Sequence, residues 1–220
     1  MNKELSIKSL EDVYAEIRRR LLHGEYLPGA RLLTQELADE MGLSRTLIRE
    51  TLQRFQGEGL VEWAPNRGVR VAKLSPEEIV QIYEVRVALE PVAVRHLIEK
   101  GPEAELIERL RNECEKARTG STVGERERAD YRFHRAILEG SGARVISEAL
   151  EHRALSLLSF KICRGIAMPA GGESAVYRGH TEITDAIERG NADLAARLLR
   201  EEIRGALERT RRALLEGDEE

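Results

Sequence analysis

The sequence contains few aromatic side chains and almost no cysteine. Aromatic residues make up 4% of the 220 residues, so a hydrophobic core must be built mainly from Leu, Ile, Val and Ala. Together with a charged fraction of 34%, this composition favours helix over sheet for most of the chain. The two cysteines, Cys114 and Cys163, lack the spacing of a metal or redox motif. We therefore expect a reduced compartment in which neither thiol acts as a nucleophile.

Long apolar runs are also missing. The first 14 residues, MNKELSIKSLEDVY, lack the apolar segment of a secretory signal. No apolar run approaches the roughly 20 residues that a membrane-spanning helix needs. These absences argue against a secreted or membrane protein and predict a soluble, cytoplasmic one without a membrane partner. A chain of this length forms one large domain or two small ones.

The net charge of −4 is unevenly distributed along the chain. Residues 1–73 contain 12 basic and 11 acidic residues, whereas the remainder contains 23 basic and 28 acidic residues. Within 44–73 the excess of basic residues is larger, with six basic against three acidic. Positive charge is thus confined to one segment, as a small DNA-reading face requires.

The first 74 residues contain three helical patterns followed by two short strand patterns. Apolar residues recur at helical spacing in 9–23, 34–41 and 44–57. Thr34 and Ser44 are placed to cap the second and third of these helices. Apolar and polar residues then alternate in 60–64 and 68–74, which predicts a β-hairpin. Three helices followed by a two-stranded wing predict a winged helix-turn-helix domain over residues 1–74.

The second domain, residues 75–220, is predicted to be all-helical. It begins with a capping box, in which Ser75 is the N-cap, Pro76 is the first helical residue and Glu78 follows three residues after the cap. Pro91 should kink or interrupt the first helix. No alternating strand pattern follows residue 74, so we expect an antiparallel helical bundle. Its helices are predicted at 78–100, 102–118, 124–140, 143–164, 173–189 and 191–216.

The third helix has the layout of a DNA-reading helix. In a helix-turn-helix, the first residues of the second helix of the motif enter the major groove and the later ones pack on the core. Here the later residues Leu47, Ile48 and Leu52 are apolar. Arg45 and Arg49 can each offer paired donors to guanine. A solvated helix face is the alternative for isolated arginines, and helix capping is the alternative for the first serine. The polar residues at the tip are Ser44, Arg45, Thr46 and Arg49.

This domain resembles the GntR family of bacterial regulators. The resemblance rests on LPGARL (27–32), ELADEMGLSRTLIRETLQRFQGEGLV (36–61) and PNRGVRVAKLS (65–75). It implies that Arg31 contacts the DNA backbone, that Gln35 reaches DNA and that Ser44 to Arg49 enter the major groove. It also implies that the wing tip, Arg67-Gly68, lies in the minor groove. Leu47-Ile48 stand where proline-valine is common, and both pairs keep an apolar face.

Two acid–histidine pairs have the spacing of neighbours on a helix. Asp130 and His134 lie four residues apart, so they can share a metal ion or hydrogen-bond to each other. Glu148 and His152 have the same spacing, and a surface hydrogen bond or ion pair accounts for them.

The second domain resembles the FCD ligand-binding domain, and this resemblance distinguishes the first pair from the second. The matching motifs are EVRVALE (84–90), DYRFH (130–134) and Gly179-His180. Glu202 stands where the family has its last histidine, and SGA (141–143) stands where SGN is usual. The resemblance implies a divalent metal site made by Asp130, His134, His180 and Glu202, which would suit Zn²⁺, Ni²⁺ or Mn²⁺.

Glu202 and Arg86 each have an alternative interpretation. Glu202 could instead pair with Arg135 or Arg178 in a pocket without metal. The resemblance implies that Arg86 holds an effector carboxylate, for which a planar guanidinium is well suited. The alternative for Arg86 is a surface pair with Glu90.

The two domains together predict a transcription regulator rather than an enzyme. We expect a homodimer that acts on a palindromic double-stranded DNA operator as a repressor, with activation as the alternative. The family resemblance implies a small organic acid as its effector. A metallohydrolase is the alternative class. It would need an open metal position and a spare acid or base, and with Glu202 as the fourth ligand no such residue is evident.

Overall fold

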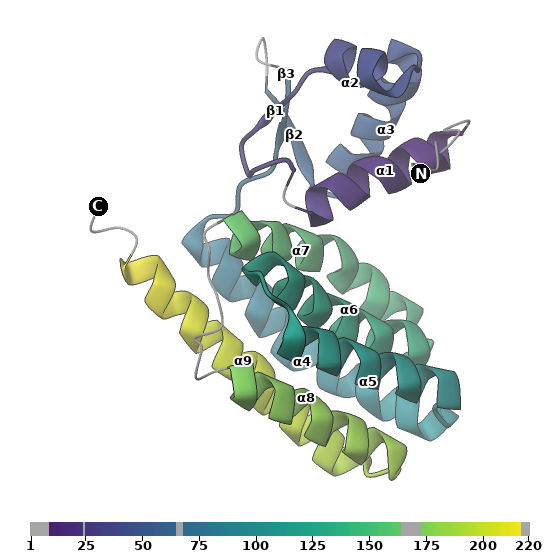
Figure 1. Cartoon of the computed structure of the whole chain (residues 1–220), viewed down its shortest axis with the longest axis vertical. Coiled ribbons are helices and arrows are strands. Elements are labelled where there is room, and N and C mark those ends of the chain that lie inside the picture. Colours follow the sequence, from purple (N-terminus) through teal and green to yellow (C-terminus); the bar gives the residue numbers. More distant parts are fainter. Residues whose placement is uncertain (1–8, 24, 65–67, 164–172, 217–220) are drawn as a thin grey trace. The chain divides into compact units, whose positions relative to one another are not determined.

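The computed structural model describes residues 9–23, 25–64, 68–163 and 173–216 (Figure 1). The chain divides into two compact units, residues 1–73 and residues 74–220. Each unit has its own core.

The first unit consists of three helices and a small antiparallel sheet, as the sequence predicts. The sheet has the strand order β1-β3-β2, in which Leu32 pairs with Val69 and Trp63 pairs with Val69 from the other side. The strand β1 was not predicted, because two residues are too few to show an alternating pattern. The elements are α1 (Leu10–Leu22), β1 (Arg31–Leu32), α2 (Thr34–Met41), α3 (Arg45–Gly57), β2 (Val61–Ala64) and β3 (Gly68–Val71).

The turn between α2 and α3 sets the geometry of the helix-turn-helix. Gly42 ends α2 with φ of +66°, a left-handed conformation that other residues adopt at a cost. The hydroxyl of Ser44 then caps α3 by accepting a hydrogen bond from the Leu47 amide at 3.2 Å, as predicted. The cap predicted for α2 is wrong. Its N-cap is Leu33, in an extended conformation without a side-chain cap, and Thr34 is already helical.

The core of the first unit joins α1 to α3. The ring of Tyr14 stacks on Phe55 with 4.6 Å between centroids, and its hydroxyl donates to Glu58 at 2.7 Å. These contacts hold α3 in place, so that its first turn is left facing solvent. The buried apolar side chains of these two helices are Val13, Ile17, Leu21, Ile48, Leu52 and Phe55.

The second unit contains six long helices and, among its described residues, no strand. In this bundle α4 packs against α9, and α6 packs against α4, α5 and α7. The helix α8 packs against α5 and α9. No described helix of the chain has the length and apolar character needed to cross a membrane. The helices are α4 (Pro76–Lys100), α5 (Ala104–Thr119), α6 (Val123–Ser141), α7 (Arg144–Cys163), α8 (Glu173–Glu188) and α9 (Ala192–Glu216).

The start of α4 agrees with the prediction, and its interior is continuous through Pro91. Ser75 and Glu78 form the predicted capping box, with hydrogen bonds of 2.9 and 3.2 Å. Of the two effects expected of Pro91, a kink or an interruption, the interruption does not occur, because α4 runs through it without a break. Pro91 is buried, as are its neighbours Ala93 and Val94. Tertiary packing therefore holds the helix together despite the missing N–H of the proline.

The bundle core positions the inner faces of α4, α6, α8 and α9. It is built from aliphatic residues with few rings, as the composition predicts. Tyr83 is one of those rings, and its hydroxyl lies 3.0 Å from that of Thr210. Fully buried members include Tyr83, Leu97, Leu110, Phe133, Ile137, Ile183, Leu199 and Ile203.

Candidate functional site

The first candidate site is the exposed start of α3. The side chains of Arg45 and Thr46 are exposed, whereas Ile48 and Leu52 behind them are fully buried. Ser44 is also exposed, and its hydroxyl is used in the cap. The polar tip and apolar back expected of a DNA-reading helix are therefore both present.

Arg49 is exposed but not simply solvated. Its guanidinium carbon lies 5.7 Å from the centroid of the Trp63 ring, within range of a cation–π contact. Since Trp63 belongs to β2, this contact joins the reading helix to the wing. Helical spacing alone could not show it, because Trp63 is 14 residues further along the chain.

The other predicted DNA contacts are divided between α2 and the sheet. Gln35 is exposed and donates a hydrogen bond to Asp39 at 2.7 Å within α2. Arg31 on β1 lies beside the start of β3, since a Cβ built on Gly68 would be 3.8 Å from its Nε. Arg67 was predicted to contact DNA and lies outside the described residues.

The second candidate site is a buried cluster of two acids and two histidines. Asp130 and His134 come from α6, His180 from α8 and Glu202 from α9, and one donor atom from each lies within 4.8 Å of all the others. The structure thus brings together all four residues that were predicted as metal ligands. His134 Nε2 is 3.3 Å from a Glu202 oxygen, and His180 Nε2 is 3.4 Å from an Asp130 oxygen.

The donor atoms in this cluster fit a divalent metal ion. Nε2 of His134, Nε2 of His180 and Oε2 of Glu202 are buried without a hydrogen-bond partner among the described residues, which is rare for buried polar atoms. Tetrahedral ligands at about 2.1 Å from an ion lie about 3.4 Å from one another. Two observed separations, 3.3 and 3.4 Å, match that spacing, and the 3.7 Å between His134 Nε2 and an Asp130 oxygen is slightly wider.

The alternative partners of Glu202 are not observed. The guanidinium of Arg135 pairs with Glu139 at 2.7 Å, and Arg178 is exposed. Glu202 instead faces His134, and the cation Arg209 reaches it only at 4.0 Å. The side chain of His152, in the second acid–histidine pair, is not among those described.

Glu90 orients His134 toward the cluster. One oxygen of the Glu90 carboxylate lies 2.7 Å from Nδ1 of His134, and the other accepts from Nε of Arg86 at 2.6 Å. Burial would raise the pKa of Glu90, but Arg86 and His134 together lower it to about 2. A carboxylate on one ring nitrogen leaves the other nitrogen facing the cluster, as in many metal-binding histidines.

Arg86 is buried and forms an ion pair. Its partner is Glu90, as in the alternative interpretation, but the pair is buried rather than on the surface. Spacing along a helix does not show which face packs inward, so the sequence alone could not distinguish a surface pair from a buried one.

Glu127 and Lys161 were not anticipated from the sequence. Lys161 on α7 forms a buried ion pair with Glu127 on α6, and its ammonium lies 3.8 Å from Asp130. A signal was available, because Glu127, Asp130 and His134 recur at intervals of three and four residues on one helix face. Lysine is almost never fully buried unless it is paired. Nothing in the sequence marks Lys161 as buried, so its position was found only from the structure.

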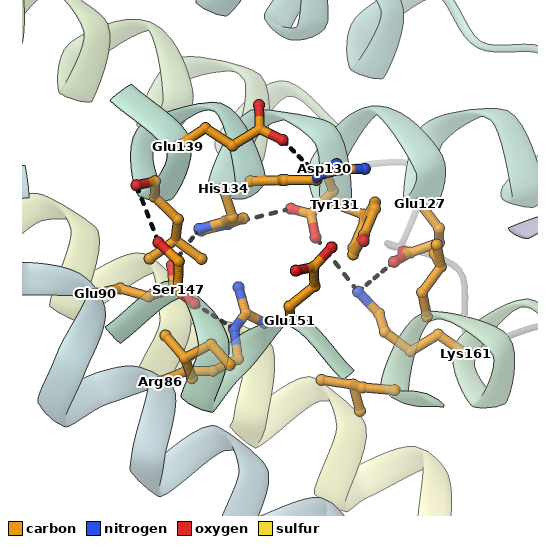
Figure 2. A pocket seen from close by; sticks show the side chains of 15 residues that line it. Arg86, Glu90, Glu127, Asp130, Tyr131, His134, Glu139, Ser147, Glu151 and Lys161 are labelled. Carbon is orange, nitrogen blue, oxygen red and sulfur yellow. Dashed lines mark hydrogen bonds and ion pairs between the residues drawn. The ribbon is translucent and has the colours of Figure 1, made fainter. Parts of the chain in front are cut away.

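A cavity of about 100 Å³ opens beside the cluster (Figure 2). Four leucines give part of its wall an apolar surface: Leu138, Leu150, Leu157 and Leu158. The polar part of the wall contains Arg86, Glu90, Glu127, Asp130, His134 and Lys161. The cavity is thus a small, partly open pocket lined by charged groups.

In and around the cluster and the cavity, buried carboxylates outnumber buried cations. The buried carboxylates are Glu90, Glu127, Asp130 and Glu202, and the buried cations are Arg86 and Lys161. Burial would lower the pKa of His134, yet Glu90 and the cluster carboxylates raise it well above its usual value. The site therefore favours additional positive charge, which a proton or a divalent ion can supply.

Comparison with known proteins identifies both units. Residues 10–71 match the model for bacterial regulatory proteins of the gntR family, and residues 81–205 match that for the FCD domain. An uncharacterized HTH-type transcriptional regulator of Bacillus subtilis strain 168 is 28% identical over 211 residues, covering 94% of this chain and 92% of that protein.

A further relative and a solved structure agree with this identification. A galactonate operon transcriptional repressor of Escherichia coli K12 is 23% identical over 219 residues, covering 87% of this chain and 92% of the relative. The solved structure of E. coli McbR/YncC has the same fold, with a TM-score of 0.74 and 21% identity over 90% of this chain and 95% of that one. The chain belongs to the gntR family of bacterial transcription regulators, with a DNA-binding N-terminal domain and an effector-binding FCD domain.

Proposed function

We propose that this regulator is a homodimeric repressor whose hold on its operator is controlled by a small organic acid bound beside a metal ion. The observation that carries the proposal is the group of buried donor atoms without hydrogen-bond partners, next to a cavity that Arg86 also lines. Such atoms are costly to bury unless a ligand or ion completes them.

The DNA-reading role is assigned to the start of α3. Arg45 and Thr46 are exposed there and can reach base edges, while Arg49 is held near the wing by Trp63. Arg31, Gln35 and Gly68 would contact the DNA backbone or the minor groove. One winged domain covers only a half-site, so a dimer on a palindrome is expected. A chromosomal operator would place this activity in the cytoplasm.

The metal would be held by Asp130, His134, His180 and Glu202. Two nitrogen and at least two oxygen donors suit Zn²⁺, Ni²⁺ or Mn²⁺, and the second carboxylate favours the harder ions of that set. When bound, the ion would supply a Lewis-acid platform for a carboxylate or hydroxyl of the effector. Glu90 holds the His134 ring in the required orientation through Nδ1.

Arg86 is the anchor for an acidic effector. Its one hydrogen bond within the described residues is made through Nε, so the two terminal nitrogens remain to bind a carboxylate side by side. The named function of the E. coli relative, repression of a galactonate operon, is consistent with an organic acid as effector. Binding would shift the population between operator-competent and incompetent arrangements of the dimer.

Three measurements on the purified protein test this function. Light scattering should give a mass near twice the 24.8 kDa of one chain. A gel shift with the DNA upstream of the gene should show specific binding. Metal analysis after purification without chelator should find about one divalent ion per chain. A single-chain mass would contradict the dimer, absence of specific binding would contradict the operator assignment, and negligible metal would contradict the metal-anchored pocket.

A further inference from the structure

One face of α6 carries three acidic or metal-binding positions in a row. Glu127, Asp130 and His134 span seven residues, which is two helical turns and about 10 Å along the helix axis. The middle and last positions, Asp130 and His134, belong to the candidate metal cluster. Each outer position is linked to a buried cation, since Glu127 pairs with Lys161 and His134 is joined through Glu90 to Arg86.

Both cations line the same cavity. In Figure 2, Arg86 and Lys161 lie on opposite sides of the view, with the carboxylates of Asp130 and Glu151 between them. Arg86 comes from α4 and Lys161 from the last turn of α7. The cavity thus has a cation at each end and carboxylates in the middle.

We propose that Lys161 is a second anchor and that the effector is a short diacid, with one carboxylate at Arg86 and the other at Lys161. This inference rests on the proposed function, because it assumes that an organic acid enters this cavity. It assigns to Lys161 a role in selecting the effector that is separate from metal binding.

The chemistry of Lys161 supports this assignment. An ammonium group has three donors, and the contacts of Lys161 within the described residues are with Glu127 and Asp130. One donor can therefore face the cavity without breaking either ion pair. Because carboxylates such as Glu151 also line the cavity, a second cation offsets the repulsion that a doubly charged ligand would meet there.

The dimensions of the site limit the length of the diacid. His134, which is linked to Arg86 through Glu90, and Glu127, which pairs with Lys161, lie about two helical turns apart along α6. The cavity that both anchors line measures about 100 Å³, which is small beside the roughly 300–1,000 Å³ of pockets that hold drug-sized ligands. Both features favour a short diacid, such as one with four carbons, over a longer one.

A purely structural ion pair is the competing explanation, and it makes a different prediction. A buried Lys–Glu pair that only supports the fold would affect stability without discriminating between ligands. A second anchor would change the ratio of affinities for diacids and monoacids. The decisive quantity is therefore a selectivity, which a change in stability alone does not alter.

Isothermal titration of the metal-loaded, full-length protein tests the proposal with four-carbon probes. Succinate and butyrate have the same number of carbons and differ by one carboxylate. The wild type should bind succinate about 10- to 100-fold more tightly than butyrate, the range expected for one charge-assisted contact. Lys161→Met should bring that ratio close to one while leaving the affinity for butyrate nearly unchanged. Lys100→Met, at an exposed lysine, is the matched control and should keep the wild-type ratio.

A second variant covers the case in which Lys161→Met does not fold. Lys161→Met combined with Glu127→Gln removes both charges of the pair, which avoids a buried unpaired carboxylate. The double variant should also lose the preference for succinate. A preference that survives in it overturns the role of Lys161. Equal binding of both acids by the wild type overturns the diacid inference but not the proposed function, whereas binding of no carboxylic acid overturns both.

Discussion

The two units hold their candidate residues in opposite ways. In the first unit, Arg45 and Thr46 are exposed on a helix whose other face is fully buried. In the second unit, His134 is buried and its two ring nitrogens face carboxylates from three different helices. A reading face must meet a large partner, so its side chains remain in solvent. A sensing pocket binds a small ligand, so its charged groups are buried and face one another.

The largest effect is expected from a change inside the buried cluster. His134→Ala removes a proposed ligand and should weaken metal binding by more than about 100-fold, because changes in outer-shell partners alone cost about 10- to 100-fold. Competition with a metal-binding dye measures this affinity. His96→Ala removes an exposed histidine and should leave it unchanged. Equal metal affinity in the two variants would remove His134 from the ligand set.

The next effect is expected on the exposed face. Arg45→Ala should cost about 1–3 kcal/mol of operator binding and relax the preference for one base pair. Its thermal stability should be unchanged, because the side chain is exposed. Fluorescence anisotropy with single-base operator variants measures both affinity and preference. Arg144→Ala removes the same charge from the other unit, and a similar loss in that variant would point to a general electrostatic effect.

A partner outside the cluster should have a moderate effect. Glu90→Gln keeps the shape of the side chain but removes the charge that binds Nδ1 of His134. Metal affinity should fall by about 10- to 100-fold, while operator preference should be retained. Glu84→Gln, at an exposed position of the same helix, is the control. Unchanged metal affinity in Glu90→Gln would show that Glu90 does not orient the histidine.

The smallest effect is expected at a backbone contact. Arg31→Ala should weaken binding to all DNA sequences by a similar factor, and it should reduce the slope of log affinity against log salt by about one. Anisotropy titrations at several salt concentrations measure this slope. A loss confined to one operator sequence would instead make Arg31 a base-reading residue.

The sequence predicted the fold well because local signals marked its elements. The cap at Ser44, the capping box at Ser75 and the helical apolar spacing are all properties of short segments, and the structure confirms them. The errors are equally local. The strand β1 is too short to leave a pattern, and the cap expected at Thr34 is one residue away from the true N-cap, Leu33.

The buried site was only partly predictable. Family resemblance pointed to Asp130, His134, His180 and Glu202, which the structure brings together, and metal binding by them stays a prediction. Sequence spacing could not reveal that Glu90 joins Arg86 to His134, because that link crosses from α4 to α6. It also could not reveal Lys161, whose burial depends on the packing of α7 against α6.

The most direct test of the account is to measure DNA reading and metal binding in the same two variants. Arg45→Ala should retain about one metal ion per chain and lose operator preference. His134→Ala should lose the metal and retain the wild-type order of preference among operator variants. If His134→Ala instead loses that order while keeping its metal, or Arg45→Ala loses its metal, the exposed reading face and the buried sensing site would not be the separate parts described.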